Sequence, residues 1–156
     1  MPYHIRDFRK ADFRRLWEID QACFVSGIAY SQQELAYYMT RRTAFTIVAE
    51  DSDAKIAGFL VGQCVRVRGE QVGHIITIDI LPEARRARLG SELMSIAEKR
   101  LSEAGCRRIS LEVAVDNAGA IGFYQRRGYS ISRTVPRYYN NELDALEMEK
   151  LLTADS

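Results

Sequence analysis

A cluster of three arginines within four residues connects a predicted strand to a predicted helix: Arg85, Arg86 and Arg88. The strand is indicated by the mostly β-branched run Ile75–Ile80, and it ends before Pro82, which cannot donate a hydrogen bond to a sheet. Apolar residues then recur at helical spacing from Leu89 to Leu101. The first N–H groups of a helix are unpaired and carry partial positive charge, so this turn suits a phosphate ligand. An ordinary connection with solvated arginines fits these residues equally well.

The elements before this turn follow from the hydrophobic pattern. Helices are predicted over residues 11–24 and 32–41, and the second begins with a capping box formed by Ser31 and Glu34. Three strands joined by short polar turns, at 44–50, 55–67 and 71–81, indicate an antiparallel meander. The helix after the arginines covers 87–104, and Gly105 is its C′ residue.

The second half of the chain adds a parallel step. A strand over 108–115 follows a strand and a helix, and such a crossover places it parallel to the strand 71–81. A helix then runs from Asp116-Asn117 to Gly128, and strands over 129–135 and 143–152 close the chain. We therefore expect one α+β domain, 1–156, with about four helices. Its sheet would be mixed and mostly antiparallel, with a central parallel strand pair.

The parallel pair has a chemical consequence. Parallel strands that diverge at their C-terminal ends open a crevice in which a ligand can lie. The arginine turn would form one lip of this crevice, and Val115–Asn117 with the following helix would form the other. A diphosphate could then sit on the helix N-terminus while an attached arm runs between the strands.

Composition indicates a globular chain without a strongly charged partner. The 156 residues carry 22 Lys and Arg against 21 Asp and Glu, so no excess charge points to nucleic acid or a membrane surface. No signal pattern and no run of membrane-spanning length is found, which makes the cytoplasm the default compartment. Three cysteines lack metal-ligand spacing with the two histidines, so we expect buried free thiols and no metal: Cys23, Cys64 and Cys106.

Taken together, these residues resemble the GNAT superfamily of acyl-CoA-dependent N-acetyltransferases over essentially the whole chain. The segment Arg85-Arg-Ala-Arg-Leu-Gly90 is similar to the family's phosphate-loop motif, Arg/Gln-x-x-Gly-x-Gly/Ala. Residues 111–129 are similar to its second motif, with four positions in register: Asn117, Ala120, Tyr124 and Gly128.

Two further segments resemble the branch that acetylates protein N-termini, including those of ribosomal proteins. They are Gly73-His74-Ile75 and the tail with Tyr138-Tyr139, Asp144-Ala145 and Met148. The loop Val25–Tyr30 lacks the Pro-Trp that is usual in the ribosomal-protein branch, which leaves the acceptor open.

The resemblance implies acetyl-CoA as co-substrate. Backbone N–H groups of the strand would hold the acyl arm and polarise its carbonyl. The implied CoA contacts are Ile78, Asp79, Ile80, Arg85, Arg86, Ala87, Arg88, Leu89, Gly90, Ser91, Asn117 and Tyr124.

The resemblance also implies the residues that act on the acceptor amine. Glu112 would be the general base, with His74 as a second candidate, and Tyr124 would be the general acid for the CoA sulfur. His74 would also line the acceptor groove, walled by two loops that carry Tyr30 and Tyr138-Tyr139. Loop packing is the alternative role for these tyrosines, and N-capping is a compatible role for Asn117.

One position departs from the family pattern, because Arg88 stands where the middle glycine is expected. A left-handed conformation there would cost arginine roughly 1–2 kcal/mol. An ordinary first-turn helical position would cost little and would let the guanidinium contact a CoA phosphate. The retained Gly90 and the flanking arginines favour this second interpretation. Asp79 is also unusual in an apolar strand, and the sequence offers no account of it.

Three functions fit these features. The first is acetyl transfer to a protein N-terminus by direct attack in a ternary complex. An α-amine has a pKa of roughly 7.7–8.0, against about 10.4 for lysine. A larger fraction of α-amines is therefore neutral at pH 7, and less help from a base is needed. The second is acetylation of a small-molecule or lysine amine, and the third is a non-catalytic acyl-CoA-binding module. Retention of Glu112 and Tyr124 argues against the third. Either a monomer or a homodimer is compatible with the sequence.

Overall fold

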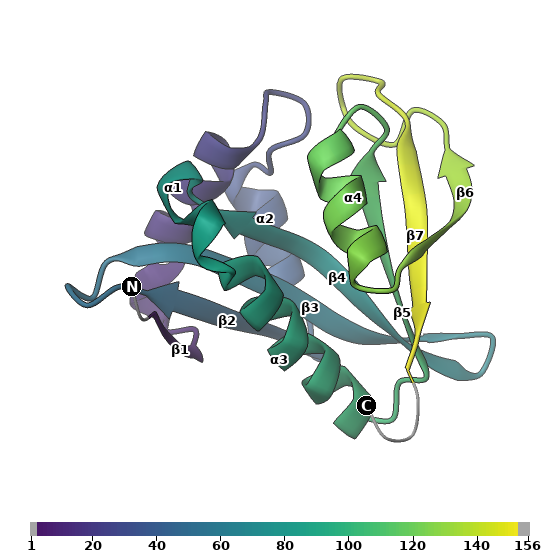
Figure 1. Ribbon diagram of the computed structural model, residues 1–156, viewed down its shortest axis with the longest axis horizontal. Coiled ribbons are helices and arrows are strands. Elements are labelled where there is room, and N and C mark those ends of the chain that lie inside the picture. Colours follow the sequence, from purple (N-terminus) through teal and green to yellow (C-terminus); the bar gives the residue numbers. More distant parts are fainter. Residues whose placement is uncertain (1–2, 153–156) are drawn as a thin grey trace.

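Seven strands form one sheet in the order β1-β2-β3-β4-β5-β7-β6 in the computed structural model (Figure 1). The structure describes residues 3–152, except for the side chains of Arg86 and Ala87. β4 and β5 are parallel, and the other five neighbouring pairs are antiparallel, which confirms the expected mixed sheet. The strands are β1 His4–Asp7, β2 Ala44–Glu50, β3 Ile56–Val67, β4 Glu70–Ile80, β5 Arg108–Ala114, β6 Ser130–Val135 and β7 Ala145–Leu151.

Helices cover both faces of the sheet. Leu16, Ile19 and Leu35 of α1 and α2 pack on one face, whereas Leu93 and Tyr124 of α3 and α4 pack on the other (Figure 1). The predicted capping box at the start of α2 is present in both directions. The helices are α1 Phe13–Cys23, α2 Gln32–Met39, α3 Leu89–Glu103 and α4 Ala118–Arg126, with 3₁₀ helices η1 Lys10–Asp12 and η2 Pro82–Ala87.

β4 and β5 separate after a short stretch of pairing. Their parallel register contains only the pairs from Val72–Arg108 to His74–Ser110, although both strands continue well beyond it. Val61 pairs with Thr77 and Gly62 with Ile75, so Ile76 is an extra residue in β4. A β-bulge bends the strand that carries it. The bulge therefore lies where β4 leaves β5, and the two strands diverge as the sequence predicted (Figure 1).

The start of α3 differs from the sequence prediction. Residues 82–87 form the 3₁₀ helix η2, and Arg88 follows with φ 59° and ψ 21°, a left-handed conformation. The preferred interpretation of Arg88 as an ordinary helical residue is therefore wrong. The helix begins at Leu89 because Arg88 reverses the chain between η2 and α3. At the other end, Gly105 has φ 96° and serves as the predicted C′ residue.

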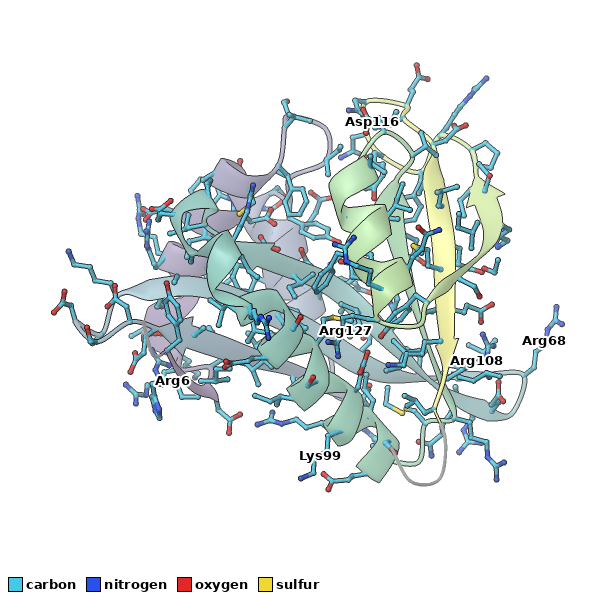
Figure 2. All side chains as sticks on the ribbon, viewed as in Figure 1. Arg6, Arg68, Lys99, Arg108, Asp116 and Arg127 are labelled. Carbon is cyan, nitrogen blue, oxygen red and sulfur yellow. The ribbon has the colours of Figure 1, made fainter. Side chains whose placement is uncertain are left out.

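A cluster of charged side chains fixes α4 against α3 and β7. Glu98 of α3 accepts hydrogen bonds from Arg127 at 3.0 Å, Tyr129 at 2.8 Å and Lys150 at 3.2 Å. Arg127 extends from the end of α4 toward α3 (Figure 2). Hydrogen bonds to charged groups are worth roughly 1.5–3 kcal/mol each. Glu98 thus links three elements and holds in place the helix that carries Tyr124.

Cys23, Cys64 and Cys106 are free thiols, as predicted, but only Cys106 is buried and the other two are partly exposed. Full burial was therefore a wrong prediction for two of them. Within residues 3–152, no helix combines the length and the apolar character needed to cross a bilayer.

The left-handed Arg88 predicts a measurable difference between two substitutions. Replacing Arg88 with Gly relieves the steric cost of φ 59°, while replacing it with Ala retains that cost and removes the same guanidinium. We expect R88G to be more stable than R88A by about 0.5–1 kcal/mol, after allowance for the larger unfolded-state entropy of glycine. Urea unfolding of both variants measures this difference. Equal stabilities would show that Arg88 is not left-handed in solution.

Candidate active site

The turn between β4 and α3 has the backbone shape of an anion-binding site. A right-handed turn, η2, is followed by the left-handed Arg88, and successive N–H groups in such a sequence form a concave nest. The unpaired N–H groups at the start of α3 add partial positive charge. An open pocket of about 380 Å³ adjoins the turn, and its lining residues are Arg88, Ser91, Glu92, Ser95 and Ile96.

The other predicted residues of this turn have different roles. Arg85 donates from Nε to the Ile80 carbonyl at 2.9 Å, so its guanidinium lies at the end of β4. Leu89 and Gly90 are buried. A Cβ on Gly90 would lie 3.1 Å from Ile80 and 3.3 Å from Phe123, so glycine lets α3 approach both β4 and α4. The side chains of Arg86 and Ala87 lie outside the described part of the chain.

The split between the strands leads from this turn to the opposite face of the sheet. Beyond His74, β4 keeps its hydrogen bonds to β3, and its other edge no longer pairs with β5. The predicted segment Ile78–Ile80 lies on this free edge. Tyr124 of α4 is 8% exposed and packs against Phe123. Burial raises the pKa of the Tyr124 phenol, and the nearby Asp79 carboxyl raises it further, so this hydroxyl stays protonated.

Glu112 and His74 lie side by side across the last paired rung of β4 and β5. His74 pairs with Ser110, and Glu112 is two residues further along β5 on the same face. The His74 Nε2 atom is 2.7 Å from Glu112 Oε1, and the two side chains are 23% and 16% exposed. Tyr138 donates its phenol hydrogen to the same Glu112 oxygen at 3.2 Å. Both candidate bases therefore belong to a single hydrogen-bonded group.

Tyr30 is held over the bulge of β4 by α1. Its N–H donates to Asp20 Oδ2 at 2.7 Å, and its carbonyl accepts from Trp17 Nε1 at 3.1 Å and from Gln21 Nε2 at 2.6 Å. The Tyr30 hydroxyl is 3.4 Å from the carbonyl of Ile76, the bulge residue. Burial raises the pKa of this phenol, which remains a hydrogen-bond donor. The sequence analysis missed these three supporting residues of α1.

The two tyrosine-bearing loops meet. Asn140 donates its N–H to the carbonyl of Gly27 at 2.9 Å. Gly27 has φ 92°, and a Cβ there would lie 2.6 Å from the Asn141 Cβ, so no other residue fits this contact without displacement. The rings of Tyr138 and Tyr139 stack edge to face at 4.8 Å. Burial and the Glu112 carboxylate raise the pKa of Tyr138, and the same causes raise the pKa of Tyr139 to about 12.

The rim of the split is formed by the end of β5. Asn117 caps α4 by accepting the Ala120 N–H at 3.1 Å, which confirms its predicted N-cap position. Asp116 lies beside it at the open end (Figure 2).

Among residues 3–152, no group of three or more His, Cys, Asp or Glu side chains is placed to hold a metal ion.

The structure thus places the predicted residues in two groups on opposite sides of the split. The turn with the nest geometry and the pocket lie beside α3, whereas the Glu112 carboxyl, the His74 imidazole, Tyr30 and Tyr138 lie on the face of α1 and α2. The pKa of Tyr124 is raised by both Asp79 of β4 and Tyr139 of the loop between β6 and β7. This arrangement can hold a phosphate-bearing ligand whose extended arm passes toward an acceptor group on the other face.

Comparisons with known proteins agree with this architecture. N-alpha-acetyltransferase 20 of Dictyostelium discoideum is 34% identical over 127 residues, which cover 76% of this chain and 69% of that protein. The crystal structure of Chaetomium thermophilum Naa20 in complex with a bisubstrate analogue superposes with a TM-score of 0.84 at 26% identity, covering 97% of this chain and 88% of that one. The ribosomal-protein-S18-alanine N-acetyltransferase from Escherichia coli shares the fold, with a TM-score of 0.82 at 21% identity over 97% and 95% of the chains.

The family model described as the acetyltransferase (GNAT) family matches residues 13–129. This range contains the turn between β4 and α3, the split and Tyr124. The resemblance noted in the sequence is therefore confirmed, and the chain belongs to the GNAT family of acetyltransferases.

Proposed function

We propose that this protein transfers the acetyl group of acetyl-CoA to the N-terminal α-amine of a protein, by direct attack within a ternary complex. The observation that carries the proposal is the split between β4 and β5, with an anion-binding turn on one side and Glu112 on the other. The similarity to N-alpha-acetyltransferase 20, and to a structure that binds a bisubstrate analogue, supports it.

In this proposal, CoA binds along the free edge of β4. Its diphosphate lies on the N–H groups around Arg88, and the pocket beside Ser91 accommodates a further part of the cofactor. N–H groups of the segment Ile78–Ile80 hold the acyl arm and donate to the thioester carbonyl. Donors that are fixed in advance stabilise the negative charge that develops on this oxygen in the transition state.

The acceptor amine enters from the face of α1 and α2. Tyr30, Tyr138 and Tyr139 wall its groove, since the loops that carry them touch at Gly27. At pH 7, roughly a tenth of α-amines are already neutral, because their pKa is roughly 7.7–8.0. Glu112 accepts, through a water molecule, the proton that the amine nitrogen loses when it attacks the thioester. His74 and Tyr138 orient the Glu112 carboxylate.

The leaving thiolate takes its proton from Tyr124. This hydroxyl lies at the split, and its raised pKa keeps the proton available until negative charge forms on sulfur. The chain thereby uses two sides of the sheet for two proton transfers. Glu112 removes a proton on the acceptor face, and Tyr124 supplies one on the cofactor face.

The acceptor class is tested with two matched peptide sets. One set has free N-termini and no lysine, and the other has blocked N-termini and one lysine. We expect acetyl-CoA turnover with the first set and at most a hundredth of that rate with the second. Faster turnover of lysine peptides or small amines would contradict the proposed acceptor. CoA binding without turnover of any acceptor would instead indicate a binding module.

A Glu112→Gln substitution tests the proposed base. Glutamine keeps the size and the hydrogen bonds of the side chain but cannot accept the proton, so we expect kcat to fall about 10²-fold. The KM for acetyl-CoA should remain within twofold, because Glu112 lies on the other face of the sheet. His74→Gln serves as the matched control and should lose less than tenfold. A larger loss in the histidine variant would identify His74 as the base.

A Tyr124→Phe substitution tests the proposed acid. The ring and its contact with Phe123 remain, whereas the hydroxyl is lost, so we expect kcat to fall about 10²-fold with little change in stability. Tyr129→Phe is the control, because it keeps the ring contact with Tyr124 and removes only a hydroxyl that donates to Glu98. That variant should lose stability and keep its rate. Full activity of Tyr124→Phe would exclude this general acid.

A further inference from the structure

Two carboxyl groups are buried together beneath the acceptor loop. Asp20 of α1 is 0% exposed and Asp79 of β4 is 1% exposed. The Asp20 carboxyl is a neighbour of Asp79 and raises the pKa of the Asp79 carboxyl. Asp20 Oδ2 accepts from the Tyr30 N–H, and Asp79 Oδ1 accepts from the Thr77 hydroxyl. The remaining oxygens, Asp20 Oδ1 and Asp79 Oδ2, have no hydrogen-bond partner among the described residues.

Two ionised carboxylates cannot occupy this position without a large cost. Burial disfavours both charges, and neighbouring like charges repel. Among the described side chains, the cation that acts on Asp79 is Arg85, which is exposed and donates to the Ile80 carbonyl. One proton placed between the two unpartnered oxygens would remove one charge and satisfy both oxygens with a single hydrogen bond.

We propose that Asp20 and Asp79 share one proton, and that this acid pair is the device that positions Tyr30 in the acceptor groove. The positioning role rests on the proposed function. The pair joins β4 to α1, and the second oxygen of Asp20 holds the N–H of Tyr30. Tyr30 then reaches the carbonyl of the β4 bulge with its hydroxyl. The same strand that would bind the acyl arm therefore also places the acceptor loop.

The electrostatic surroundings of Asp79 favour the state in which one of the two carboxyl groups is protonated and neutral. Burial, and then the neighbouring Asp20, hold the pKa of Asp79 well above its ordinary value. Burial also raises the pKa of the Cys23 thiol to about 11, so no thiolate is present to compete for the proton. Among the described side chains, the titratable and charged groups that act on Asp79 or are acted on by it are Asp20 and Cys23 of α1, Tyr30, Arg85 of η2 and Tyr124 of α4.

Proton sharing is tested without any acceptor. Carboxyl ¹³C NMR of aspartate-labelled protein, titrated from pH 4 to 9, should show one aspartyl proton retained at pH 7. Exposed aspartates should titrate near pH 4. The retained proton should be absent in Asp79→Asn and in Asp20→Asn, and present in the surface control Asp53→Asn. Complete ionisation of every aspartate in the unsubstituted protein by pH 6 would overturn the proposal.

The pair also predicts the sign of a pH dependence. The folded state keeps a proton that the unfolded chain releases above about pH 4, so unfolded chains bind fewer protons in the window up to the raised pKa. Stability contributed by the pair is therefore complete below about pH 4 and declines as the pH rises. We expect the Tm of Asp79→Asn, measured relative to the Tm of the unsubstituted protein, to rise between pH 5 and pH 9. A constant difference would contradict the shared proton.

The positioning role is read from Trp17 and from the acceptor KM. Trp17 is the only tryptophan of the chain, and its indole donates to the Tyr30 carbonyl, so its fluorescence reports the anchoring of the loop. Asp79→Asn, which replaces the proton with an amide N–H, should keep the Trp17 emission. Asp79→Ala should shift the emission and raise the acceptor KM about tenfold.

Two results separate failure of this role from failure of the proposed function. An unchanged Trp17 emission and acceptor KM in Asp79→Ala would overturn the positioning role. If the unsubstituted protein acetylates no N-terminal peptide, the proposed function fails, and the NMR titration and the Trp17 emission still decide whether the pair shares a proton and anchors the loop. Should Asp79→Ala fail to fold, the Trp17 emission is measured in Asp20→Asn instead. This isosteric variant should keep the emission of the unsubstituted protein, and a shifted emission would count against the proposal.

Discussion

The early end of pairing between β4 and β5 is the constraint on which the site depends. Three residue pairs join the two halves of the sheet. Beyond them β4 pairs only with β3, and β5 pairs only with β7. A ladder that continued would satisfy the β4 edge internally and leave no room between the strands. The bulge at Ile76 bends β4 away, and the Glu98 cluster holds α4 behind the opening. The fold thus maintains an unpaired edge that a ligand with polar groups can complete.

The two faces of the split differ in chemistry although the chain as a whole is nearly neutral. On the α3 side, backbone N–H groups and arginines favour anions, and this preference requires no excess of positive charge elsewhere. On the α1 side, Glu112 and the tyrosines provide acceptors and donors for an amine. Separation by the sheet keeps the carboxylate away from the phosphate position. In the proposed reaction, only the acyl group has to pass from one face to the other.

Local patterns predicted the elements, and tertiary contacts determined what the sequence did not reveal. Capping residues and periodicity located α2 and the meander because they act within a few residues of the chain. The bulge was missed because one extra residue leaves an isoleucine-rich run unchanged in appearance. Asp20 was missed because its partners, Tyr30 and Asp79, are distant in sequence. Glu112 and His74 were separate candidates until the register placed them on one face of neighbouring strands.

The left-handed Arg88 shows why a departure from a family motif need not abolish a site. A nest requires a positive φ, and glycine is only the residue that adopts it at the lowest cost. Arg88 adopts φ 59° and keeps the N–H groups of the turn in position, at a steric cost of roughly 1–2 kcal/mol. Strain of this kind persists where surrounding structure enforces it, and here Gly90 holds α3 close to β4 and α4. Arginine at this position therefore changes the side chain beside the pocket and preserves the backbone geometry of a nest.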